Sequence, residues 1–235
     1  MLPLRDNVPT RSFPVITIGL IAVNVIVWLW ESRGRLELDI AKYGFYPCSF
    51  ASHCTGPLAP YRALSPWESA FSSMFMHASW IHIGGNMLFL WIFGNNVEDA
   101  LGKARYLLWY LAGGLAATAS QTVVTLHFGN AADAGIPSIG ASGAIAAVLG
   151  AYFVLLPNAR ILTLVMIVFF PIFVELHALW FLGIWFLFQF LSGEQSLTHP
   201  ASGGGIAFFA HIGGFVFGML TVKLVAQRRP LRPTL

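Results

Sequence analysis

Charged residues are scarce in this sequence. Only 10% of its 235 residues are Asp, Glu, Lys or Arg, whereas 57% are hydrophobic. Because a soluble domain carries about 25% charged residues, this composition excludes an ordinary soluble enzyme. Apolar runs recur along almost the whole chain, which predicts an integral membrane protein made of one helical bundle, without a separate soluble domain.

Cysteine is also scarce, and the positive charge is not concentrated. The net charge of +3 comes from Lys and Arg residues spread over short loops and the C-terminal tail. A nucleic-acid-binding protein would gather them in a stripe, so membrane topology explains them better and no nucleic-acid partner is expected.

Cys48 and Cys54 fall in one polar loop that we place outside the cytoplasm. Oxidation there can join them, and two free thiols fit the sequence equally well.

Six apolar runs approach the roughly 20 residues that a membrane-spanning helix needs. They cover residues 13–30, 79–95, 106–128, 138–156, part of 161–191, and 206–226. The first run is too long for a signal-peptide core and lacks a small-residue cleavage pattern, so we expect it to remain as a span. The fifth run holds either two short hairpin helices or an interfacial segment before the true span. Pro171 and Glu175 favour the second arrangement, with the span at residues 172–191.

The distribution of Lys and Arg predicts the orientation of these spans. With the N-terminus inside, the inner segments hold nine Lys and Arg residues and the outer segments hold four. The positive-inside rule then places both termini in the cytoplasm, and we expect a multi-pass protein of a bacterial cytoplasmic membrane. Residues 1–12 form a cytoplasmic N-terminal segment, residues 13–226 the membrane domain with a long outer loop between its first two helices, and residues 227–235 a basic cytoplasmic tail.

Three polar side chains lie inside apolar segments, where they are costly and therefore mark a functional site. They are His82, Ser142 and His211. The second, fourth and sixth spans all run from outside to inside, and each of these residues lies three to five positions past the outer end of its span. At about 1.5 Å per residue, all three share a depth of about 5 to 8 Å. This common layer predicts one site near the outer face.

Small residues predict that the helices carrying Ser142 and His211 pack closely. Ala146 and Gly150 follow Ser142 on one helix, and Gly214 and Gly218 follow His211 on the other. Small residues at four-residue spacing let membrane helices approach. The approach would bring the Ser142 hydroxyl to the His211 ring, as a general base requires. Taken alone, Ser142 could instead bond a carbonyl one turn back, but His211 at matching depth favours catalysis.

His82 and Asn86 lie four residues apart, and therefore on one face of their helix. Acyl transfer develops negative charge on the former carbonyl oxygen. We expect His82, Asn86 and the backbone N–H of Ser142 to stabilise it. A structural hydrogen-bond network is the alternative for His82 and Asn86. Metal binding by the histidines at positions 77, 82, 177 and 211 is disfavoured because no HExxH or similar spacing is present.

These motifs together resemble those of the rhomboid intramembrane serine proteases. HIGGNM at residues 82–87 is similar to the His and Asn of the family's second helix, GASG at residues 140–143 to its GxSG nucleophile motif, and HIGG at residues 211–214 to the histidine of its sixth helix. The resemblance covers residues 67–226. In one respect the chain departs from the family, because Trp67 is followed by Glu68 where a Trp-Arg pair is common.

The resemblance implies a six-helix fold and a serine endopeptidase. Ser142 would attack a peptide bond of a transmembrane protein near the outer membrane surface, and His211 would take its proton, without an acid, metal or cofactor. A rhomboid-like pseudoprotease that binds membrane clients without cleaving them is the main rival. Such a protein normally lacks the Ser or the His. A transporter is disfavoured because its polar residues would lie at the midplane.

The remaining polar residues suggest supporting roles. Glu175, His177, Glu194 and Gln195 flank the fifth helix, which by resemblance forms a lateral gate, so they either tune substrate entry or solvate the interface. Gln121 and Gln189 are expected to join helices by hydrogen bonds. His77 is expected at a loop or cavity rim. The glycines within residues 200–209 predict a flexible lid.

Overall fold

A computed structural model describes residues 1–51, 54, 56, 58–129, 131–167, 169–198, 207–228 and 233. Its long helices are α1 (Val15–Glu31), α4 (Trp80–Leu101), α5 (Lys103–Phe128), α7 (Ser142–Leu155), α8 (Ala178–Thr198) and α9 (Phe208–Val225). Most of the predicted lid at residues 200–209 and of the basic tail at residues 227–235 lies outside the described residues. Among the described helices, α5 and α9 are both long and apolar enough to cross a bilayer, and α1 and α7 are shorter apolar helices.

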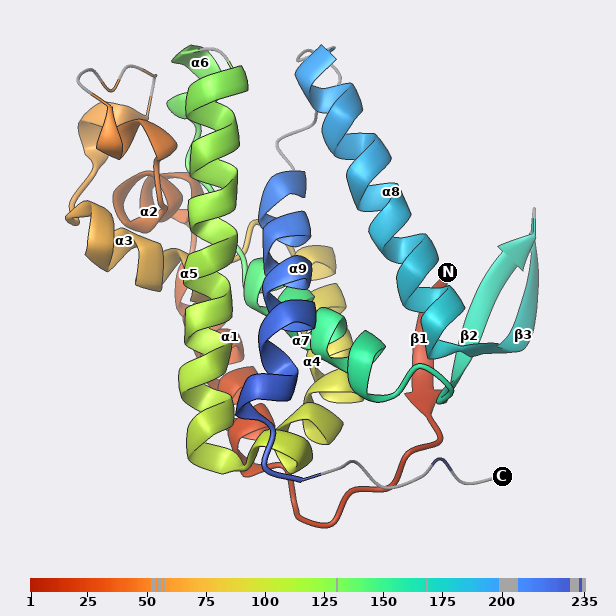
Figure 1. Ribbon diagram of the computed structural model, residues 1–235. Helices are drawn as coiled ribbons and strands as arrows, with labels where there is room; N and C mark the ends of the chain where they lie inside the picture. The colour runs from red at the N-terminus through yellow and green to blue at the C-terminus, as the bar shows by residue number, and fades with distance from the viewer. Residues whose placement is uncertain are drawn as a thin grey trace.

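Helix α7 lies at the centre of the molecule. Every residue from Gly143 to Tyr152 is buried, and α4, α5, α8 and α9 pack around it (Figure 1). The contact with α9 is close because both helices present glycine or alanine. A Cβ atom on Gly218 would overlap the carbonyl oxygen of Ala147, and one on Gly214 would overlap that of Gly143. The small residues therefore allow the backbone approach that the sequence predicts.

Residues 160–167 and 170–177 form a β-hairpin, where the sequence predicts either two short hairpin helices or a span that begins at residue 172. Strands β2 (Arg160–Ile167) and β3 (Phe170–His177) pair antiparallel, and β1 (Leu2–Asp6) pairs with β2 to give the order β1-β2-β3. Helix α8 begins at Ala178, not at residue 172. β-Branched and aromatic residues favour strands, and Pro171 is tolerated because β3 is an outer strand. The protein is mostly helical, as expected, but it also contains a three-stranded sheet that the prediction of an all-α fold lacks.

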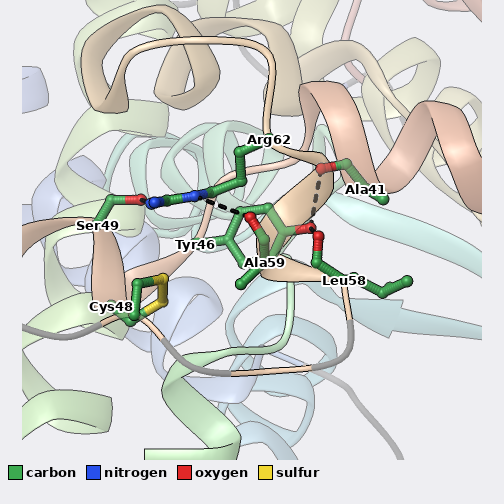
Figure 2. Close-up of a disulfide and its surroundings, with 8 residues drawn as sticks. Ala41, Tyr46, Cys48, Ser49, Leu58, Ala59 and Arg62 are labelled. Atoms are coloured by element: carbon green, nitrogen blue, oxygen red, sulfur yellow. Dashed lines mark hydrogen bonds between the residues drawn. A yellow bond between two sulfur atoms is a disulfide. The ribbon is translucent and has the colours of Figure 1, made fainter.

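The segment between α1 and α4 is folded and carries the two cysteines. It contains α2 (Leu36–Tyr43), α3 (Pro66–Ser72) and the short helices η1 (Pro47–Phe50), η2 (Ala59–Tyr61) and η3 (Ser73–Phe75). Cys48 and Cys54 form a disulfide. The hydroxyl of Tyr46 donates to the carbonyl oxygens of Ala41 and Leu58, and the Arg62 guanidinium lies over the Tyr46 ring (Figure 2).

The departure at Glu68 has a local structural role. Ser65 is the N-cap of α3, and its hydroxyl accepts from the Glu68 backbone N–H while the Glu68 carboxylate accepts from the Ser65 backbone N–H. This capping box satisfies two backbone donors at the start of the helix. The Ser65 hydroxyl also donates to the Glu68 carboxylate at 2.7 Å, and this hydrogen bond, together with the one from the Ser65 backbone N–H, lowers the pKa of Glu68. Glu68 therefore fixes where α3 begins.

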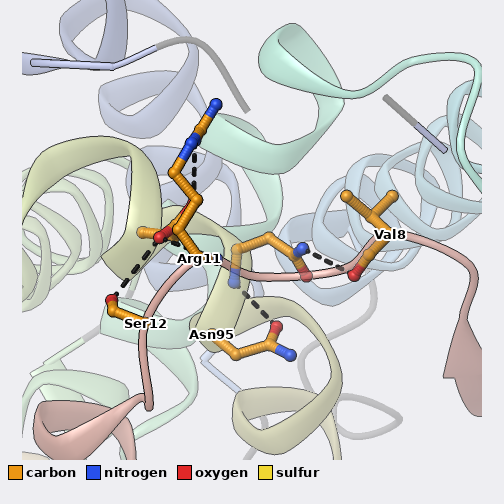
Figure 3. Close-up of polar contacts among 6 residues, drawn as sticks. Val8, Arg11, Ser12 and Asn95 are labelled. Carbon is orange, nitrogen blue, oxygen red and sulfur yellow. Dashed lines mark hydrogen bonds and ion pairs between the residues drawn. The ribbon is translucent and has the colours of Figure 1, made fainter. Parts of the chain in front are cut away.

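The N-terminal segment is bound to the end of α4. The Arg11 guanidinium and the Asp99 carboxylate form an ion pair of 3.0 Å, and the Ser12 hydroxyl lies 3.5 Å from the same carboxylate. The Asn96 amide donates to the carbonyl oxygen of Val8 at 3.1 Å (Figure 3). These contacts attach residues 8–12 to the end of α4 and help to position β1 beside the hairpin.

Candidate active site

Ser142 is the first residue of α7, and the preceding turn presents its side chain. Gly140 has φ of +125°, a conformation that favours glycine, and its N–H donates to the Ser73 carbonyl oxygen at 2.8 Å. The backbone N–H of a first helical residue has no acceptor within its own helix. The positive end of α7 therefore faces the atoms around Ser142, which favours negative charge there.

The structure brings His211 of α9 to Ser142. Nε2 of His211 and Oγ of Ser142 lie 2.8 Å apart. On the other side of the ring, Nδ1 lies 2.7 Å from Oε1 of Gln189 on α8. Because an amide oxygen can only accept, Nδ1 carries the proton and Nε2 is free to accept the Ser142 hydroxyl. This is the tautomer that a general base for serine needs.

His82 and Asn86 of α4 also face this site. The His82 ring lies against Gly140, where an added Cβ atom would be 2.9 Å from Nε2. Nδ1 of His82 accepts the backbone N–H of Ala78 at 3.4 Å, so Nε2 carries the proton and points toward the turn at Gly140. Asn86 uses one amide hydrogen on Nε2 of His77 at 3.0 Å. Its second amide hydrogen remains available.

A cavity of about 560 Å³ joins these groups. Its lining includes Ser142, His211, His82, Asn86, Gln189 and Trp185. Two of the lining side chains are titratable, His82 and His211, and the rest are neutral. The cavity therefore offers a nucleophile, a base and several hydrogen-bond donors, and the described residues that line it include no carboxylate.

His77 is buried and does not lie at a rim, contrary to the sequence prediction. Its exposure is 0%, its ring packs edge-to-face on His82 with centroids 5.0 Å apart, and its backbone N–H donates to the Glu31 carboxylate at 3.2 Å. The residue precedes α4, and its ring contacts both His82 and Asn86 of that helix. The only sequence signal was its spacing of five residues from His82.

The other polar residues divide into two groups. Gln121 and Gln189 join helices as expected, since Oε1 of Gln121 accepts the backbone N–H of Ala210 at 3.1 Å and Gln189 binds His211. Glu175 lies on β3, pairs with Arg160 at 3.4 Å and does not line the cavity. His177 ends β3, while Glu194 and Gln195 lie in the last turns of α8. Within the described residues, no three His, Cys, Asp or Glu side chains gather as a metal site.

Comparison with known proteins shows the family. The rhomboid domain model matches residues 64–228. The chain is 31% identical over 202 residues to presenilin-associated rhomboid-like protein A, mitochondrial, of Danio rerio, which covers 86% of this chain and 45% of that protein. It is also 31% identical over 154 residues to rhomboid protein 1, mitochondrial, of Saccharomyces cerevisiae, covering 65% of this chain and 40% of that protein. The chain belongs to the rhomboid family.

A shorter match joins the chain to a named protease. It is 34% identical over 99 residues to the rhomboid protease GluP of Bacillus subtilis, covering 42% of this chain and 18% of that protein. The chain thus spans less than half the length of each of these relatives.

The expected location in a bacterial cytoplasmic membrane is wrong. The relatives that align over most of this chain are mitochondrial proteins. The prediction that both termini lie in the cytoplasm assumed that membrane, so it is withdrawn as well. Residue counts can predict which segments share a side of a membrane, but they contain no information about which membrane it is.

Proposed function

We propose that this chain is an intramembrane serine endopeptidase that hydrolyses peptide bonds of transmembrane proteins with a Ser–His dyad. The distance of 2.8 Å between Ser142 Oγ and His211 Nε2 is the observation that carries the proposal. Helices α1, α4, α5, α7, α8 and α9 would form a six-helix membrane domain. Helix α7 has only 14 residues, about 21 Å at 1.5 Å per residue, but it is enclosed by other helices and need not reach both surfaces.

Catalysis begins with nucleophilic attack. As the Ser142 oxygen bonds to the substrate carbonyl carbon, its proton passes to Nε2 of His211. The protonated ring then gives that proton to the leaving amine, and the peptide C–N bond breaks. A water molecule, deprotonated by the same nitrogen, then bonds to the acyl carbon. The bond from that carbon to the Ser142 oxygen breaks, and the ring returns its proton to Ser142. One base therefore serves both halves of the reaction.

The negative charge on the carbonyl oxygen would be stabilised by three donors. These are the backbone N–H of Ser142 at the start of α7, Nε2–H of His82 and the second amide N–H of Asn86. Each is held by the fold before substrate arrives, which is what makes such donors effective.

Substrate would reach the cavity from the bilayer. The lining residues Trp185 and Gln189 are on α8, and the neighbouring side chains of that helix are apolar and exposed, among them Leu187, Phe188 and Phe190. An apolar outer face suits contact with lipid and with a transmembrane segment. The mitochondrial names of several relatives support a mitochondrial membrane as the location.

A serine-directed phosphonate probe tests the proposal. The parent in liposomes should be labelled and should cleave a model transmembrane substrate, and both signals should be absent from Ser142→Ala. A parent that binds the substrate but is neither labelled nor able to cleave it would instead support the pseudoprotease alternative. Labelling that persists in Ser142→Ala would place the reactive serine elsewhere.

A further inference from the structure

Gln189 holds the outer side of the His211 ring. It lies on α8 within an otherwise apolar sequence, Trp185 to Leu191, and its amide oxygen is 2.7 Å from Nδ1 of His211 on α9. An amide inside an apolar helix is costly unless it is hydrogen-bonded. The ring nitrogen supplies that partner, so this interhelical hydrogen bond ends on the base itself.

The same face of α8 contacts the ring a second time. Trp185 lies four residues before Gln189, and therefore on the same side of the helix. Its ring centroid is 5.9 Å from that of His211, with the planes inclined at 39°. The Trp185 ring limits tilting of the imidazole, and the hydrogen bond to Gln189 limits its rotation about the side-chain bonds. Helix α8 thus determines where the base points.

We infer that Gln189 is a positioning residue that makes the dyad a Ser–His–Gln arrangement, an inference that rests on the proposed function. Its amide oxygen selects the tautomer with the proton on Nδ1 and so leaves Nε2 as the acceptor for Ser142. Without that acceptor the neutral ring can adopt either tautomer. In the other tautomer Nε2 carries a hydrogen and cannot take the serine proton.

A neutral amide suits this place better than a carboxylate. The other groups that line the cavity carry no fixed negative charge. A buried carboxylate would have to be desolvated, and its attraction to a protonated ring does not always repay that cost. The amide orients the ring without adding a charge. Its loss should therefore be milder than the roughly 10⁴-fold loss known when a buried triad aspartate becomes an amide.

Three variants separate hydrogen bonding from packing. Gln189→Met removes the acceptor at nearly the same length, and Gln189→Glu restores an acceptor oxygen. The matched control is Gln121→Met, because Gln121 also ties another helix to α9 but binds the backbone of Ala210 instead of the ring. Cleavage of a model transmembrane substrate and the rate of phosphonate labelling are measured for each.

Gln189→Met should lower both kcat and the labelling rate by about 10-fold to 100-fold, by analogy with the loss seen when the partner that orients a metal-binding histidine is removed. KM should stay within about 2-fold, because Gln189 acts on the ring and not on bound substrate. Gln189→Glu should recover most of the rate, and Gln121→Met should alter thermal stability more than kcat. A Gln189→Met protein with parental rates, or a Gln189→Glu protein as slow as Gln189→Met, would overturn the inference.

A measurement independent of activity tests the same role. ¹⁵N spectra of the histidines in the Ser142→Ala protein, assigned with His211→Gln, report which ring nitrogen is protonated. We expect His211 to be protonated on Nδ1 and to become a tautomer mixture when Gln189→Met is added. A mixture already present with Gln189 intact would overturn the inference. A pure Nδ1–H tautomer in a chain that does not cleave would overturn only the proposed function.

Discussion

Asn86 donates its amide hydrogen to Nε2 of His77, and the two nitrogens lie 3.0 Å apart. Asn86 is 8% exposed and His77 is fully buried, so water competes little for this bond. Since Nε2 accepts, the imidazole holds the amide plane of Asn86, which lines the cavity, and uses only one of its two amide hydrogens. Asn86 is thereby oriented before a substrate binds.

Replacement of Asn86 should slow turnover without removing the nucleophile. Loss of one oxyanion donor typically costs about 100-fold to 1,000-fold in rate, so Asn86→Ala should lower kcat by that factor. Labelling of Ser142 by the phosphonate should persist, since Ser142 and His211 are unchanged. Turnover of a transmembrane substrate in liposomes checks this, and a parental kcat would exclude Asn86 from oxyanion stabilisation.

His77 should matter through Asn86. In His77→Leu the amide loses its acceptor, so kcat should fall, but by less than in Asn86→Ala because the donor itself remains. His77→Gln offers an amide oxygen as a substitute acceptor and should recover part of the loss. The double variant His77→Leu with Asn86→Ala should be no slower than Asn86→Ala alone, because the two act as a unit. Additive losses would show that His77 acts by another route.

Ser142 and His211 should also behave as a unit. Either Ser142→Ala or His211→Ala should abolish cleavage while the helices stay folded, as circular dichroism in detergent can verify. Because each member is useless without the other, the double variant should be little worse than either single one. Full cleavage by Ser142→Ala would contradict the assigned nucleophile.

The sequence predicted the central helices and the three motifs because each gives a local signal. Ser142, His82 and His211 are polar residues in apolar segments, and such residues are rare enough to be noticed individually. The seam of small residues predicted that α7 and α9 would meet. Gly218 against Ala147 is the contact that results. These features depend on spacing along single helices, which a sequence records directly.

The hairpin and the supporting residues were harder to predict. A continuous apolar run does not distinguish a buried strand from a helix, so the sequence predicts a span from residue 172 and no strands, although Ile161, Val165 and Ile167 are β-branched. His77 acts on Asn86 from the turn before α4, and Gln189 acts on His211 from a different helix. Spacing alone does not indicate that Gln189 faces a ring 22 residues away.

Gly218 should be intolerant of any side chain. A Cβ atom there would overlap the carbonyl oxygen of Ala147 and lie 3.0 Å from its Cα atom, so α7 and α9 would have to separate. A displacement of about 1 Å can cost roughly 100-fold in rate, and overpacking typically costs about 1 to 3 kcal/mol. We expect Gly218→Leu to lose most activity and thermal stability, and Gly218→Ala to show a smaller loss.

Gly19 provides the control for Gly218. It lies on α1 with nothing within 4 Å of the position where a Cβ atom would be. Gly19→Ala should therefore leave activity and the melting temperature in detergent near the parental values. If Gly218→Leu matched Gly19→Ala in both measurements, the close packing of α7 and α9 would not be the basis of the dyad geometry.

The Asp6 carboxyl group should make stability depend on pH. Asp6 lies at the end of β1 and accepts the Tyr152 hydroxyl at 2.5 Å. Burial raises its pKa from 3.8 to about 6, against the lowering effect of that hydrogen bond. The folded state therefore holds the Asp6 proton more tightly than the unfolded state does, and protonation of Asp6 stabilises the fold. This contribution to stability is complete below about pH 4 and is lost as pH rises through about 6. A shift of about two units corresponds to about 3 kcal/mol.

Asp6→Asn cannot ionise, so the melting temperature of the parent relative to Asp6→Asn should fall between pH 4 and pH 7. If the melting temperatures of the parent and of Asp6→Asn changed with pH in the same way over that range, Asp6 would ionise as readily in the folded chain as in the unfolded one.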